Sequence, residues 1–506
     1  MEAYNIIKEA DQFSLSGHKF SSLIQRLKSD ETARMDHSEL ESFVDKEGRE
    51  IMRQLCQDHL DLRTRREPKL EMIEGSDGQS RTHRREGETR TLRMKFGDLE
   101  VTRIGYEGRG MSGLRPLDAE LNMPFGLCSF GVQRDMVDHA VKMSFEETGI
   151  QNERMTGVHV SKRAIEKMTR HAAQDFDAFY EQQGTREESL DDLLVLSSDG
   201  KGVVVRKCDL REETRKRADR EKRTKRKKRL SPGQKKNRKR MAVVGAVYSK
   251  ERNVQSAEQV MGPRESAPSD NVVQLKPKRS RPKNKRAWAS LEKDPDVVMD
   301  QIFKEALRRD PEKRREWVFP VDGDLHQLKR IEDFAELNEV KVTIVCDFVH
   351  VLEYLWDASH CFNKVGSDEA EQWVFERAME VLQGNAGQVA GGMRRSATMR
   401  DLPEEKRKGV DDCARYLINH KAYLRYDEYL EKGYPIASGV IEGTCRHLIN
   451  DRLDITGARW SLDGAEAILK LRSMWASGDL DEYWTFYKSR ELERNHLANY
   501  AGNPLR

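Results

Sequence analysis

The sequence predicts an α/β core, a mixed five-stranded sheet with flanking helices, behind an α-rich N-terminal half with a small β-hairpin region. Three observations support this prediction. Apolar residues recur at helical spacing in the first third of the chain, β-branched runs begin near residue 191, and strand-like and helix-like segments then alternate as far as residue 347. A chain of 506 residues also has room for roughly two to four domains.

Charge and cysteine content exclude several classes of protein. The chain has 90 Lys and Arg against 87 Asp and Glu, so its net charge of +3 conceals strong local asymmetry. Its seven cysteines include no C-x-x-C pair, which indicates neither a disulfide framework nor a zinc knuckle. The N-terminus lacks a basic segment followed by an apolar one, and no run approaches the ~18 apolar residues of a membrane helix. We therefore expect a soluble protein of a reducing cytoplasm.

The N-terminal half reads as three regions. A helical region, 1–66, contains an apolar helical pattern from 36 to 66 that predicts a packing or dimerisation helix. A small β-rich region, 67–124, carries RTLRMKF and LEVTRI on either side of Gly97-Asp98, which predicts a hairpin turning at that dipeptide. The arginines around the hairpin fit phosphate contact and a solvated surface about equally well.

The third region, 125–188, resembles a helix-turn-helix. Two amphipathic segments are joined by the connection 157–160, and Ser161 is placed to cap the second. In a DNA-binding motif, the second helix would enter the major groove with Lys162, Arg163, Lys167 and Arg170. Two helices joined by a turn are also a common packing unit, so DNA binding and simple packing both remain open here.

The informative half begins at Asp191. DDLLVLSSDGKGVVVRK predicts a strand, a turn at Asp199-Gly200-Lys201-Gly202 and a second strand, and RMAVVGAVYS (240–249) predicts a third. A helix (297–309), a strand (317–322), a helix (325–337) and a strand (340–347) follow. Strand-strand-strand-helix-strand-helix-strand is the element order of an RNase-H-like domain.

Such a domain takes acids from its first strand, the end of its fourth strand and a late helix. Two divalent ions held by these acids activate a nucleophile and stabilise a leaving oxygen in phosphoryl transfer. Carboxylates suit this work because Mg²⁺ prefers oxygen ligands. We expect Asp199 to end the first strand and Asp322 the fourth, whereas Asp347 ends the fifth and competes with Asp322. The strand order favours Asp322 and leaves Asp347 a supporting role.

Two further motifs surround these acids. Asp347 and His350 form a D-x-x-H motif at the start of a helix. Such a pair can orient a metal ligand, a water or a strand end. The alternative is a capped helix with a partly buried histidine. Glu442 follows small residues in GYPIASGVIEGTCRHLIND, with Arg446 and His447 at helical spacing. A glutamate there can simply favour the helix dipole, but an unpaired charge among apolar residues is costly unless it meets a cation.

Four segments together resemble a known family: LSSDGKGVVVRKCDLREETRK, WVFPVDGDLHQLKRI, IVCDFVHVLEYLW and SGVIEGTCRHLINDRLDITGARWSLDGAEAILKLR. They are similar, in order, to the DDE transposases of ISKra-type bacterial insertion sequences, which are related to Mutator-like transposases. The resemblance implies an RNase-H-like catalytic domain over 189–361 and 435–480, a helical insertion at 362–434 and a C-terminal tail at 481–506.

The resemblance also implies roles for single residues. It makes Asp199, Asp322 and Glu442 the catalytic acids that hold two Mg²⁺ or Mn²⁺ ions, and its supporting residues are Asp347, His350, Arg446 and Trp460. One segment departs from the family pattern. Relatives often carry cysteines where this chain has Gly105–Leu114, and this segment has none. The DNA-binding duty of any zinc site there would pass to other groups.

A basic arm at 207–240 supports DNA binding independently. From Arg211 to Arg240 the chain has 17 Lys or Arg and 4 acids, a local net charge of +13, and we place this stretch between the second and third strands. Neutralising DNA phosphates releases counterions and raises affinity, whereas the alternative is a solvated loop. The arm's candidate DNA-binding residues are Lys225, Arg226, Lys227, Lys228, Arg229, Lys235, Lys236, Arg238, Lys239 and Arg240. A second basic stretch, within 262–294, is rich in Pro and predicts a flexible linker.

The sequence therefore predicts a DDE transposase that cuts DNA and transfers the strand in a metal-dependent reaction. Its partners would be double-stranded DNA, as element ends and target, and further copies of itself in a homodimer or higher oligomer on DNA. The resemblance places it in the bacterial cytoplasm at the nucleoid, with no membrane partner. Two alternatives remain: an RNase-H-like nuclease that does not join strands, and a domesticated DNA-binding regulator without metal chemistry.

Overall fold

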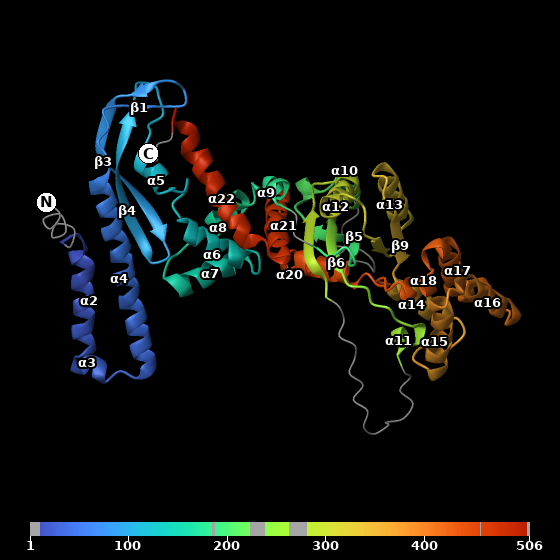
Figure 1. The fold of residues 1–506 in the computed structure, drawn as a ribbon. Helices are drawn as coiled ribbons and strands as arrows, with labels where there is room; N and C mark the ends of the chain where they lie inside the picture. The colour runs from blue at the N-terminus through green and yellow to red at the C-terminus, as the bar shows by residue number, and fades with distance from the viewer. Residues whose placement is uncertain (1–10, 185–187, 223–237, 263–280, 456, 503–506) are drawn as a thin grey trace. The chain divides into compact units, whose positions relative to one another are not determined.

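The computed structural model describes residues 11–184, 188–222, 238–262, 281–455 and 457–502 (Figure 1). The chain divides into two compact units. The first combines Met1–Gln182 with Asp479–Arg506, and the second comprises Gln183–Gly478. Within the described ranges, no helix has the length and apolar character needed to cross a bilayer.

The first unit is mainly helical. Its helices are α2 (Ser14–Leu27), α3 (Asp30–Ala33), α4 (His37–Arg66), α5 (Pro116–Glu120), α6 (Phe130–Ala140), α7 (Phe145–Thr156), α8 (Lys162–Ala172), α9 (Phe176–Gln182) and α22 (Leu480–Asn495), with short 3₁₀ turns at Asp11–Phe13 and Leu497–Asn499. The predicted helix over 36–66 is confirmed by α4, which starts in a capping box built on Asp36 and Glu39. Its strands are β1 (Ile73–Glu74), β2 (Ser80–Arg81), β3 (His83–Met94) and β4 (Gly97–Glu107).

The hairpin of β3 and β4 is confirmed, but the predicted turn at Gly97-Asp98 is wrong. Both residues lie in β4, where Gly97 pairs with Met94 and Asp98 with Arg93, so the turn falls one dipeptide earlier. The Arg93 guanidinium donates to the Asp98 carboxylate at 2.7 Å, and this cross-strand ion pair favours the observed register. β4 also packs on α4 through a cluster that includes Leu60, Leu99 and Val101.

The segment from 130 to 182 confirms the predicted helices of the helix-turn-helix-like region. α7 ends at Gly157 in a left-handed conformation, and the Ser161 hydroxyl accepts a hydrogen bond from Ala164 N at the start of α8. Residues 481–506, predicted as a tail, contain α22 instead. This helix packs within the first unit, where Glu491 pairs with His171 at 3.0 Å and Asn122 donates to the Lys488 carbonyl at 3.0 Å.

The second unit is built on the predicted mixed five-stranded sheet with flanking helices. Its strands are β5 (Leu193–Val204), β6 (Lys239–Lys250), β7 (Lys283–Ser290), β8 (Trp317–Val321) and β9 (Val342–Cys346), arranged in the order β7-β6-β5-β8-β9. β6 runs antiparallel to β5 and β7, while β5, β8 and β9 are parallel. All five residues of β8 are buried, as expected for a central parallel strand.

Three strand assignments require correction. The predicted turn at Asp199-Gly200-Lys201-Gly202 is wrong, because β5 runs through it without a break and pairs with β6 along its whole length. The two predicted strands around that turn are therefore one strand, and Asp199 lies inside it. The third strand is β7, within the stretch predicted as a linker, and the basic arm lies between the first and second strands. β7 is an edge strand with Lys283 and Arg286, and such charges are typical of sheet edges.

Helices of the second unit follow the predicted order around the sheet. They are α10 (Glu212–Lys222), α11 (Ala257–Met261), α12 (Pro295–Arg309), α13 (Leu325–Leu337), α14 (Phe348–Ser359), α15 (Asp368–Leu382), α16 (Ala386–Met399), α17 (Glu404–Asn419), α18 (Tyr426–Glu431), α19 (Gly439–Cys445), α20 (Asp451–Leu453) and α21 (Leu462–Ser477), with 3₁₀ turns at Lys207–Asp209 and Lys421–Tyr423 and a π-helical turn at Arg446–Asn450. α15 to α18 show that the stretch predicted as an insertion is helical. α12 packs on β6 and α21 on β7.

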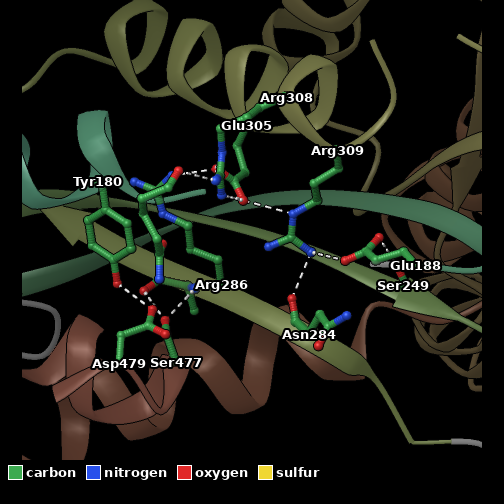
Figure 2. A network of polar contacts seen from close by, with 12 residues as sticks. Tyr180, Glu188, Ser249, Asn284, Arg286, Glu305, Arg308, Arg309, Ser477 and Asp479 are labelled. Carbon is green, nitrogen blue, oxygen red and sulfur yellow. Dashed lines mark hydrogen bonds and ion pairs between the residues drawn. The ribbon is translucent and has the colours of Figure 1, made fainter. Parts of the chain in front are cut away.

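A buried glutamate joins α12 to the sheet edge (Figure 2). Glu305 accepts hydrogen bonds from Arg308 at 2.9 Å and Arg309 at 2.7 Å within α12, and it also pairs with Arg286 of β7. Arg309 in turn donates to the Asn284 carbonyl at 2.7 Å. Burial alone would raise the pKa of Glu305, but the nearby arginines outweigh it and lower this pKa to about 2.

We expect Glu305→Gln to lower the free energy of unfolding by about 3–5 kcal/mol, because it leaves buried arginine charge without its anion. Since the folded-state pKa is depressed, this stabilisation is complete above the ordinary pKa near 4.5 and is lost as the pH falls towards about 2. Denaturant unfolding at pH 7 and at lower pH measures both effects.

The matched control is Glu312→Gln. Glu312 pairs with Arg314 at 2.9 Å, but its side chain is 68% exposed, so we expect a change within about 0.5 kcal/mol. Equal losses in the two variants, or a Glu305→Gln effect that does not shrink in acid, would contradict this account of the network.

Candidate metal centre

Three carboxylates stand at the same level across three neighbouring parallel strands. Leu194 of β5 pairs with Trp317 of β8, and Trp317 pairs with Val342 of β9. Five residues beyond each of these positions the chain has Asp199, Asp322 and Asp347. Counting along the register therefore puts the three acids at the same level. β5 pairs with β8 at Leu194 and Val195, and Asp199 lies farther along β5, inside the strand.

Asp347 is fully buried, and its carboxylate binds protein donors. One oxygen accepts a hydrogen bond from Val349 N at 2.7 Å and so caps α14. The other accepts from Ser438 N at 2.7 Å and from the Ser438 hydroxyl. A second tether lies beside it, where Phe348 N donates to the Ile436 carbonyl at 2.8 Å. Asp347 thus fixes the segment that leads into α19 against the end of β9.

Glu442 lies on α19, four residues after Ser438. Its side chain is exposed, and its carboxylate has neither a hydrogen-bond donor nor an ion-pair partner among the residues that the structure describes. The far end of the same helix is held on β5, because the Cys445 thiol donates to an Asp199 carboxylate oxygen at 3.2 Å. Burial, and then the charge of Asp199, raise the pKa of Cys445, so this thiol keeps its proton. Glu442 therefore lies between the tether to Asp347 and the tether to Asp199.

Asp199 is half-buried in β5 and pairs with Val244 of β6. Its second carboxylate oxygen accepts from Gly200 N at 2.6 Å. Each oxygen thus has one donor, and each keeps a further lone pair for a ligand.

Asp322 is exposed at the end of β8, and the helical segment 362–434 holds the loop that carries it. Its carboxylate accepts from Asp324 N at 3.0 Å, and its carbonyl accepts from the Tyr416 hydroxyl of α17 at 3.0 Å. The next residue, Gly323, has a φ of +96°, and a Cβ there would lie 2.8 Å from the Tyr416 hydroxyl oxygen. His420 contacts the Gly323 carbonyl at 2.8 Å through its Nε2. The sequence pattern gave no signal for Tyr416 or His420.

One group of potential metal ligands converges within the described ranges. Asp347, His350 and Glu442 each offer an atom within 4.8 Å of the other two. His350 also contacts the Glu353 carboxylate, at 3.1 Å from its Nδ1. Asp199 and Asp322 lie outside this group. Two carboxylates with an imidazole suit Mn²⁺, whereas an all-carboxylate set of Asp199, Asp322 and Glu442 suits Mg²⁺.

The two remaining supporting residues differ in setting. Trp460 is buried, and its indole donates to the Leu453 carbonyl at 3.0 Å. Its backbone N donates to the Val204 carbonyl at the end of β5 at 3.2 Å. Arg446 is exposed and lies 3.8 Å from the Asp451 carboxylate. Trp460 therefore anchors the segment after the site, while Arg446 is open to solvent.

The candidate DNA-binding residues fall into three groups. Lys162, Arg163, Lys167 and Arg170 are all exposed on α8. Near the arm, Lys239 lies 3.4 Å from Asp454. Arg240 donates hydrogen bonds to the Leu291 and Asp209 carbonyls at 2.8 and 2.9 Å. Arg238 has a polar partner. The arm residues Lys225, Arg226, Lys227, Lys228, Arg229, Lys235 and Lys236 lie outside the described residues.

Comparisons with known proteins add little. The sequence matches no protein-family model and no curated protein. A search of solved structures found a "Drosophila P element transposase strand transfer complex", with a TM-score of 0.24 and 10% sequence identity, covering 74% of this chain and 83% of that chain. A TM-score this low does not establish a shared fold.

We expect Asp347→Asn to cost about 2–3 kcal/mol of stability, because an amide cannot accept from all three donors that meet this buried carboxylate. Asp322→Asn should change stability by less than about 0.5 kcal/mol, since its side chain is exposed. Chemical unfolding of the two variants measures the difference, and equal losses would contradict the anchoring role of Asp347.

Proposed function

We propose that the second unit is an RNase-H-like catalytic domain of the DDE transposase type, which cuts DNA at its own insertion sequence and joins the cut strand to a target. The observation that carries this proposal is the placement of the acids. Counting along the register puts Asp199 and Asp322 at one level, and α19, which carries Glu442, contacts Asp199 through Cys445. The segments quoted above as similar to ISKra-type transposases include all three acids.

Asp199, Asp322 and Glu442 would hold two divalent ions, Mg²⁺ or Mn²⁺. Bound ions of this kind activate water towards a phosphodiester and stabilise the oxygen that leaves. The protein contributes fixed acids: the Cys445 thiol orients the Asp199 carboxylate, and Tyr416 holds the loop that carries Asp322. Hydrolysis breaks one P–O bond and leaves a 3′-hydroxyl, which then attacks a phosphodiester of the target and displaces its 3′ oxygen.

Asp347 and His350 would position the residues of the site. The buried Asp347 positions the start of α19 through Ser438, and His350 lies close to Glu442. His350 would then either hold a metal ion together with Glu442 or orient the Glu442 carboxylate. Asp199, Asp322 and Glu442 would then be the catalytic acids, and Asp347 would be a positioning residue.

DNA would reach the protein through exposed cations. The four basic residues of α8 are open to solvent, on a helix that follows a short turn, as in a recognition helix. Phosphate contacts by such residues supply affinity rather than sequence readout. We propose the element ends and the target as the DNA partners, with two or more copies of the chain bringing the ends together.

We expect Asp199→Asn, Asp322→Asn and Glu442→Gln each to lower DNA cleavage and strand transfer at least about 1,000-fold, because each removes a charged metal ligand. DNA binding should remain within about twofold. Cleavage and joining of labelled element ends with Mg²⁺ or Mn²⁺, alongside a binding assay, measures both.

Glu336→Gln, an exposed acid of α13, is the control and should keep full activity. Full activity in the Asp322→Asn protein would remove that acid from the mechanism. Cleavage without joining by the wild-type protein would favour a nuclease, and metal-independent binding with no cleavage would favour a regulator.

We also expect Arg163→Ala combined with Lys167→Ala to weaken binding to all DNA sequences and to reduce the salt dependence of binding by about one unit of slope per lost phosphate contact. Lys406→Ala combined with Lys408→Ala removes two exposed lysines of α17 and is the control for net charge. An unchanged salt slope in the double variant would show that α8 does not contact phosphates.

A further inference from the structure

The helical pair α2 and α4 places polar residues where its helices face each other. The two helices run side by side, joined through α3 (Figure 1). Ser16 N donates to the Asp58 carboxylate at 3.2 Å, Arg26 pairs with Glu47 at 2.9 Å, and Lys19 pairs with Glu50. These contacts show that the helices are antiparallel. Ion pairs of this kind, which are partly exposed, contribute little stability.

Leu23 is buried, but several other apolar residues of the pair face outward. α2 exposes Phe20, Ile24 and Leu27, and α4 exposes Leu40, Val44, Met52 and Leu55; Phe20 is 54% exposed. The spacing i, i+4, i+7 places the α2 residues on one side of that helix, and Leu40, Val44 and Leu55 share one side of α4. We call these six residues the apolar flank; Met52 points about 120° away from Leu40 and lies off it.

Both halves of the apolar flank lie on the same side of the pair. On α2, Phe20 and Leu27 each follow by one residue a side chain that contacts α4, namely Lys19 and Arg26. On α4, Leu55 likewise follows Gln54, which is buried. One residue turns a helix by about 100° in a fixed sense. Because the helices are antiparallel, this same rotation points both sets of side chains to one face.

The flank is large enough for a specific interface. α2 has 14 residues and α4 contributes its part from His37 to Leu55, so at 1.5 Å per residue and about 10 Å of width the two present roughly 500 Å². A symmetric pair would bury roughly 1,000 Å², the lower limit for a specific protein interface. An apolar patch of this size matches the largest patch on a typical monomer, about 300–600 Å², and such patches are often functional.

Charge identifies the partner. From Ser14 to Leu55 the chain has seven Lys or Arg and eight Asp or Glu, so the segment is nearly neutral and offers no attraction to DNA or to an anionic membrane. A two-fold symmetric contact sets the same patch against itself and needs no opposite net charge. We propose that a second copy of this chain covers the apolar flank, so that two α2–α4 pairs form a four-helix bundle.

This interface does not depend on the proposed chemistry, so the full-length protein is tested without DNA or metal ions. We expect light scattering after gel filtration to give a dimer at micromolar concentration. Ile24→Glu, and more strongly Ile24→Glu with Val44→Glu, should raise the dissociation constant about 100-fold or more, because an unpaired charge would be buried at the interface. Circular dichroism should show unchanged helix content.

The matched control is Leu15→Glu. Leu15 is an exposed apolar residue of the same helix that lies off the flank, and its variant should stay dimeric. If a glutamate variant loses helix, Phe20→Ser with Val44→Ser applies the same test with neutral side chains. A monomeric wild-type protein, showing that the flank is covered within one chain, would overturn the proposal. So would a dimer that persists in every folded flank variant.

Discussion

A single buried carboxylate determines where α19 begins. Asp347 receives hydrogen bonds from Val349 N, Ser438 N and the Ser438 hydroxyl, so the end of β9, the cap of α14 and the start of α19 meet at one side chain. Burying a charge is costly unless donors surround it, and this requirement leaves little freedom for the segment that enters α19. Because Glu442 lies on α19, its backbone position is fixed as well, although its side chain is exposed.

Asp322 depends on a different part of the chain. The helix α17 reaches it through Tyr416, which donates to its carbonyl, and through His420, which contacts the next carbonyl. Only glycine fits at position 323, because its φ is positive and a side chain there would collide with Tyr416. The helical segment between the second and third acids is therefore also a clamp on the second acid. Helices that follow the sheet in sequence thus hold two of the proposed catalytic acids: α17 holds Asp322 through Tyr416, and α19 holds Asp199 through Cys445.

The sequence predicted the succession of elements better than their limits. Apolar runs located the buried strands, but the glycines after Asp199 read as a turn, and it is long-range pairing with residues such as Val244 that keeps this stretch extended. β7 escaped detection because an edge strand can be rich in charge. At the site, the acids were predicted from their place in the element order. Ser438 and Cys445 were not, because a single hydroxyl or thiol has no periodic pattern and acts only through a tertiary contact.

The pairing of β5 with β6 continues for five residues beyond Asp199, to Val204 opposite Lys239. A slip of one residue in this ribbon would turn Asp199 to the opposite face of the sheet. The pairing on both sides of Asp199 along β5 therefore fixes which face its side chain takes. The chain between Val204 and Lys239 begins only where this ribbon ends. Closing a longer loop costs about 0.6 kcal/mol for each doubling of length. Insertions and deletions can therefore accumulate in this connection during evolution without disturbing the orientation of Asp199.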